Sequence, residues 1–136
     1  MRGIGQVSIE VLLLLAVLLG FVGASLAALS SIYSAASFAA DAGAAKSFTD
    51  SILQKAAQLS LLGDGSQFEL SARPAGKWEF IQRAGSCTLS LESRASIKKE
   101  FPVPQNVKCA LSANEFSKNF SVKLYRKDGA LILADN

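Results

Sequence analysis

Histidine, cysteine and isolated acids set which chemistry this 136-residue chain can perform. Histidine is absent, which removes Ser-His-Asp and Cys-His catalysis as well as histidine-based metal sites. The two cysteines, Cys87 and Cys109, are too far apart for a redox CxxC pair and too few for a structural zinc site. We therefore expect neither enzyme activity nor a bound metal or cofactor.

The cysteine pair has two interpretations. In a small secreted domain it forms one disulfide, which for a loop of this size contributes about 3 kcal/mol in the chain-entropy model. In a reducing compartment the same residues are two buried free thiols.

Glu10 is an acid in an unusual position. It stands at the edge of a run from Val11 to Ala40 that contains no charged side chain. An ionisable group beside or within a membrane-length apolar helix costs about 2.5–3.5 kcal/mol on insertion scales, so such a group is expected to have a function and a partner.

One long helix, predicted from Gln6 to about Leu62, positions Glu10. Proline does not occur before Pro74, and the uncharged run is longer than the about 20 residues that one membrane span needs. From residue 45 the helix becomes amphipathic, and one apolar stripe should pack on the second part of the chain. That stripe consists of Phe48, Ile52, Ala56 and Leu59.

Small residues recur at a spacing of four inside the apolar run. Such residues lie on one helix face and allow neighbouring helices to approach closely, which favours association where no water drives it. An ordinary alanine-rich membrane anchor has the same composition. One ridge is Ala16, Gly20, Ala24 and Ala28, and the other is Gly23, Ala27, Ser31, Ala35, Ala39 and Gly43.

After the helix the hydrophobic period changes to two. Gly63 is placed to take a left-handed cap conformation, and Asp64-Gly65 supplies a turn. Five segments then alternate as half-buried strands of an antiparallel sheet, and Asp128-Gly129 predicts a hairpin. Both cysteines are in phase with the apolar residues, which favours the disulfide. The alternating segments are 68–72, 78–80, 87–91, 107–111 and 120–124.

These patterns predict an α+β fold in which the C-terminal half of one long helix packs on a small antiparallel sheet or sandwich head. From residue 67 on there are 11 Lys and Arg against seven Asp and Glu. This mild surplus lacks the dense basic runs of a nucleic-acid site, so no nucleic-acid partner is expected. Asn119-Phe120-Ser121 fits the N-glycosylation pattern, with Asn119 expected to face outward.

The residues Gln6, Ser8, Glu10 and Leu14 spell Q-x-S-x-E-x-x-x-L directly after Gly5. This pattern resembles the class III signal peptide of archaeal type IV pilin-like proteins. In that family a prepilin peptidase cuts after the glycine and leaves the apolar stretch on the mature protein, whereas a secretory signal is lost. The resemblance implies a pilin-like lollipop with a leader at 1–5, a helix at 6–62, a turn at 63–66 and a β-rich head at 67–136.

By this resemblance Gly5 precedes the cut, Gln6 becomes the N-terminus, and Glu10 is the fifth residue of the mature subunit. The family's acid at that place pairs with the terminal amine of a neighbouring subunit. Removing one member of such a buried pair costs about 3–5 kcal/mol, so Glu10 would set the register of assembly. A cut after Gly3 is the alternative, and it makes Glu10 the seventh residue. If Gln6 cyclises to a lactam, the free terminal amine is lost. Glu10 would then form a hydrogen bond or be protonated, instead of forming an ion pair.

The resemblance implies a structural subunit of an archaeal type IV-like adhesion pilus. The expected partners are identical or related pilin subunits, the prepilin peptidase and the pilus assembly platform. The precursor would lie in the cytoplasmic membrane with Arg2 inside and the head outside, and the assembled filament would be extracellular. One alternative is a membrane-anchored extracellular binding module that does not polymerise. Another is a secreted β domain from which a conventional signal peptidase removes the stretch through about Ala27.

Overall fold

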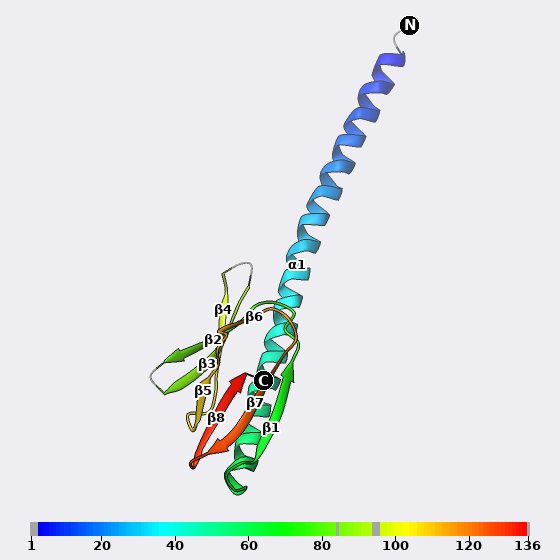
Figure 1. The fold of residues 1–136 in the computed structure, drawn as a ribbon. Helices are drawn as coiled ribbons and strands as arrows, with labels where there is room; N and C mark the ends of the chain where they lie inside the picture. The colour runs from blue at the N-terminus through cyan, green and yellow to red at the C-terminus, as the bar shows by residue number, and fades with distance from the viewer. Residues whose placement is uncertain (1–2, 84, 94–95, 136) are drawn as a thin grey trace. The chain divides into compact units, whose positions relative to one another are not determined.

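The computed structural model describes residues 3–83, 85–93 and 96–135, with side chains from residue 8 on. The long helix α1 spans Gly3–Leu61, and the elements that follow it in the described residues are β-strands (Figure 1). The strands are β1 (Gln67–Ala72), β2 (Trp78–Arg83), β3 (Ser86–Glu92), β4 (Lys98–Pro102), β5 (Val107–Ala110), β6 (Glu115–Phe116), β7 (Phe120–Lys127) and β8 (Ala130–Asp135).

The chain divides into two compact units, residues 1–36 and residues 37–136. We call the described side chains of the first unit, residues 8–36, the apolar segment. The second unit, here the head unit, contains the rest of α1 and the strands. The fold is α+β, as the sequence predicts: one long N-terminal helix followed by a small domain rich in antiparallel sheet.

In the described residues the strands form two four-stranded sheets, ordered β1-β7-β8-β5 and β4-β3-β2-β6. Four of the five alternating segments lie within strands, and the fifth, 107–111, extends one residue past the end of β5. The Asp128-Gly129 hairpin joins β7 to β8. The expectation of an antiparallel sheet is wrong for one pair, because β5 runs parallel to β8. Alternation shows which face of a strand is buried, whereas the direction of pairing depends on the path of the chain between strands.

One face of α1 completes the core of the head unit. Ala45, Phe48, Ile52, Ala56 and Leu59 are all buried there at helical spacing, together with side chains from both sheets. Fully burying a large apolar side chain contributes about 1.5–3 kcal/mol, so this stripe is a major part of the stability of the head unit.

Phe48 links the helix to both sheets. Its ring centroid lies 5.9 Å from that of Trp78 on β2 and 5.6 Å from that of Phe120 on β7. These tilted and edge-on arrangements are the favourable geometries for aromatic pairs. The helix therefore acts as a layer that both sheets share.

Candidate functional site

The apolar segment presents its side chains to the outside. Within residues 8–36 every described side chain is exposed except that of Ser25, which is half-buried. Ser8, Glu10 and Leu14 of the Q-x-S-x-E pattern belong to this exposed set, whereas the side chains of Gly5 and Gln6 lie outside the described residues. A continuous apolar surface of this kind marks a region that is covered by lipid or by other protein.

Length and composition allow α1 to cross a membrane. An 18-residue window of the helix has a mean hydropathy of 2.6, and none of that window is buried within the chain. Ser25 and Ser34 turn their hydroxyls back to the carbonyls of Phe21 and Ser31, at 2.8 and 2.9 Å. Hydroxyls that bond to their own helix leave fewer polar groups unpaired in an apolar surrounding.

The small residues of the apolar segment are open to approach. A Cβ placed at Gly20 or at Gly23 would meet nothing within 4 Å. The other predicted packing residues, which are Ala16, Ala24, Ala27 and Ala28, are exposed as well. Larger residues at these positions would therefore leave contacts within the chain unchanged.

Asp41 is the first charged residue after the apolar run, and sequence analysis did not single it out. Its side chain is buried, and one carboxylate oxygen accepts hydrogen bonds from the indole Nε1 of Trp78 at 2.8 Å and the backbone N–H of Ala75 at 3.0 Å. The other oxygen accepts the N–H of Gly76 at 3.0 Å. A Cβ at Gly76 would lie 2.9 Å from that oxygen, so a larger residue there would displace the Asp41 carboxylate.

The Asp41 contacts tie three elements together. Residues 73–77 connect β1 of one sheet to β2 of the other, and the carboxylate on α1 holds this connection by its backbone. A buried carboxylate is tolerated when hydrogen-bond donors replace its water. Asp41 therefore positions the two sheets on the helix.

Arg126 of β7 caps the C-terminus of α1. Its Nη1 donates to the carbonyls of Ser60 at 2.9 Å and Leu62 at 2.7 Å, and its Nε forms an ion pair with Asp64 at 3.2 Å. Cationic donors at this end of a helix pair its last carbonyls and oppose its dipole. The expected left-handed cap at Gly63 is absent, and the positive φ lies at Gly65 instead, with a value of 93°.

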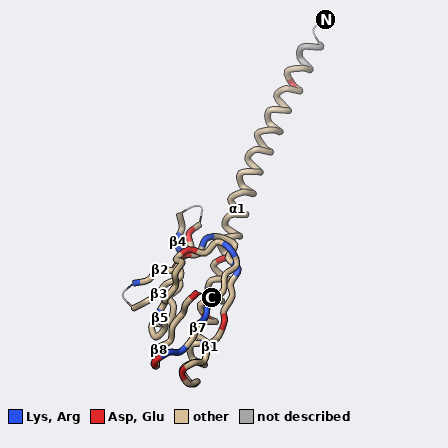
Figure 2. The backbone as a smooth tube through the Cα atoms, viewed as in Figure 1, with Lys and Arg blue, Asp and Glu red and all other residues tan. Residues whose placement is uncertain are grey.

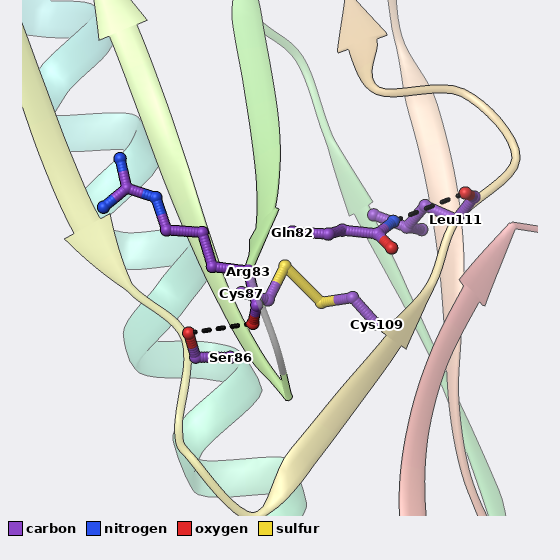
Figure 3. The surroundings of a disulfide bond; sticks show 6 residues. All are labelled: Gln82, Arg83, Ser86, Cys87, Cys109 and Leu111. Atoms are coloured by element: carbon purple, nitrogen blue, oxygen red, sulfur yellow. Dashed lines mark hydrogen bonds between the residues drawn. A yellow bond between two sulfur atoms is a disulfide. The ribbon is translucent and has the colours of Figure 1, made fainter.

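Cys87 and Cys109 form a disulfide between the two sheets (Figure 3). Cys87 is buried on β3, Cys109 is on β5, and their Cα atoms are 6.1 Å apart. Close to the sulfurs, Gln82 Nε2 donates to the carbonyl of Leu111 at 3.5 Å. Because the bridge connects strands of different sheets, it fixes how the sheets face each other, and disulfides of this kind are typical of oxidising compartments.

Charged residues gather in the head unit, whereas the first part of α1 is largely without them (Figure 2). On the surface of the head unit Lys77 Nζ lies 2.7 Å from Glu115 Oε1, and this hydrogen bond and ion pair raise the pKa of Lys77. Both side chains are more than half exposed, so the pair contributes little to stability. Among the described residues no group of three His, Cys, Asp or Glu side chains is placed to hold a metal ion.

No protein-family model, curated protein or solved structure matches the chain.

Replacing Asp41 by alanine should destabilise the head unit. The change removes the acceptor of three hydrogen bonds, and each bond to a charged group contributes about 1.5–3 kcal/mol, so we expect a loss of at least about 2 kcal/mol in the free energy of unfolding. The measurement is urea unfolding of the detergent-solubilised chain, followed by the fluorescence of its single tryptophan, Trp78.

Asp50→Ala is the matched control, because Asp50 is an exposed acid on the same helix. Surface changes of this kind alter stability by less than about 0.5 kcal/mol. Equal effects of the two substitutions would contradict the role given to Asp41.

Proposed function

We propose that this chain is a pilin, a structural subunit of an archaeal type IV-like adhesion pilus. In this proposal a prepilin peptidase cuts after Gly5, and the subunit polymerises through its N-terminal helix. The observation that carries the proposal is the pattern of Gln6, Ser8 and Glu10 after Gly5, directly ahead of an uncharged run of 30 residues from Val11 to Ala40.

The exposed apolar segment supports this proposal. Apolar side chains around the whole circumference of a helix cannot be covered by a contact on one side. Lipid covers them before assembly, and neighbouring helices cover them in a filament. The stripe from Ala45 to Leu59 is already occupied by the sheets, so the head unit leaves the apolar segment available for this second role.

The small residues give a physical reason why such helices would associate. In a membrane no hydrophobic force draws helices together, and close packing at Gly, Ala and Ser surfaces takes its place. The residues of both ridges are exposed, and a Cβ placed at Gly20, Gly23 or Gly43 would meet nothing within 4 Å. They are therefore available to the helices of other subunits.

Glu10 would set the axial register between subunits. Its carboxylate is exposed in the single chain, and inside a bundle of apolar helices it would be strongly destabilising without a partner. The terminal amine of a neighbouring subunit neutralises it only when that subunit enters at the right height. If Gln6 cyclises, a hydrogen bond to the lactam takes the place of the ion pair.

The disulfide supports an outer location for the head. Cys87 and Cys109 are bonded, and such bonds persist outside the cytoplasm. Arg2 on the cytoplasmic side agrees with the positive-inside rule. The precursor would thus be held in the cytoplasmic membrane with its head outside, and the assembly platform would move it into the extracellular filament.

Gly20→Leu should block filament formation while the head unit stays folded. The added side chain meets no atom within the chain but prevents close approach between helices. The control is Val22→Leu, which enlarges an exposed residue on the opposite helix face. The measurement is the amount of filament sheared from cells, viewed by electron microscopy. Equal filament yields from the two variants would exclude the small-residue ridge as a packing surface.

Glu10→Gln should leave processing and the fold of the head unit intact and reduce filament yield by about tenfold or more, because a lost buried pair costs about 3–5 kcal/mol. Asp50→Asn is the control, since it removes an exposed acid from the polar part of the same helix. Normal filaments from Glu10→Gln would refute the register role. Cells that display the unaltered chain at the surface without any filament would favour the anchored binding module.

A further inference from the structure

The tripeptide Asn119-Phe120-Ser121 has no part in the proposed assembly. It is the one Asn-x-Ser/Thr sequence of the chain, because Asn106 and Asn114 lack a hydroxyl residue two positions later. Such tripeptides are the acceptors of N-linked glycans. A glycan also needs an accessible asparagine, and the fold determines which of the three side chains is accessible.

The fold turns Asn119 outward. Asn119 is exposed and stands directly before β7. The next side chain, Phe120, points the other way: its ring stacks on Phe116 with centroids 4.2 Å apart and meets Phe48 edge-on. Because neighbouring side chains in extended chain alternate between faces, the inward ring of Phe120 fixes the outward direction of Asn119.

The surface beside Asn119 has room for a sugar. Asn119 borders an open hollow of about 440 Å³, which is also lined by Ser71, Ala72, Arg73, Phe120 and Ser121. Hydroxyl and guanidinium groups at such a hollow are suitable neighbours for a hydrated, hydroxyl-rich ligand. Asn106, the control used below, is also exposed but lies outside this hollow.

We propose that Asn119 is the attachment site of an N-linked oligosaccharide. In the transfer step the carboxamide nitrogen of Asn119 attacks C1 of the first sugar of a lipid-phosphate-linked oligosaccharide. The new bond joins this nitrogen to C1, the bond from C1 to the phosphate oxygen breaks, and the lipid phosphate leaves. The amide nitrogen loses one proton to a base of the transferase. This assignment rests on the proposed function for the outer location of the head and for the archaeal host of the test.

The register of β7 indicates when the transfer occurs. Ser121 stands opposite Ser71 in the pairing of β1 with β7, and its side chain is half-buried. Phe120 is packed in the aromatic cluster. A transferase that reads the hydroxyl at the third position needs the tripeptide outside the sheet. Transfer therefore takes place on the emerging chain, before β7 pairs with β1.

The test uses the full chain, purified from an archaeal host that glycosylates its own surface proteins. Intact mass and peptide mass spectrometry should show hexose-containing additions on the peptide that carries Asn119. Asn119→Gln and Ser121→Ala should abolish the addition, whereas Ser121→Thr should retain it because threonine keeps the acceptor pattern. Asn106→Gln, the exposed asparagine without the pattern, should leave the addition unchanged.

An unmodified Asn119 in chains that begin at Gln6 would overturn this proposal and leave the proposed function intact. A glycan on chains that keep Met1 and form no filament would support the attachment site and contradict the pilin proposal. An addition that persists in Asn119→Gln would place the sugar elsewhere and overturn the assignment.

Discussion

The head unit depends on the burial of one face of α1 against its two sheets. Ala45, Phe48, Ile52, Ala56 and Leu59 follow helical spacing and form one core with side chains from both sheets. The β-rich part from residue 67 on, about 70 residues, buries little apolar surface by itself, and such small folds need additional stabilising interactions. Three such interactions are present: Asp41 holds the connection between the sheets, Arg126 caps the helix, and the disulfide joins β3 to β5.

The two acids of α1 that border the uncharged run have opposite surroundings. Asp41 is buried, and donors from its own chain surround its carboxylate. Glu10 is exposed at the edge of a segment that carries no other charge from Val11 to Ala40. Burial of a carboxylate without donors is strongly unfavourable, so in the assembly that we propose a neighbouring subunit would have to supply a partner for Glu10.

Much of the fold could be predicted from local patterns. The helical spacing of Phe48 and Ile52 predicted the buried stripe, and the phase of the cysteines favoured a disulfide. Asp128 and Gly129 predicted the hairpin, where both have positive φ, 52° and 75°. These signals depend on neighbours within a few residues, so they can be read from a single sequence.

The features that sequence analysis missed depend on distant partners. Arg126 caps a helix that ends more than 60 positions earlier, and the donors to Asp41 lie 34 to 37 positions later. The only local signal for Asp41 was an acid at the end of an uncharged run. The parallel pairing of β5 with β8 is likewise a consequence of the chain's path between sheets. For the apolar segment, the sequence pattern suggests an assembly role, and the structure shows an exposed apolar surface.

We propose that the apolar segment stays on the mature protein as an assembly helix. The decisive measurement is the N-terminal sequence and intact mass of protein purified from surface filaments. We expect a chain that begins at Gln6, either as glutamine or as its lactam. A chain that begins between Ser25 and Ala28 would contradict it, because the helix that carries Glu10 would then be absent from the mature protein.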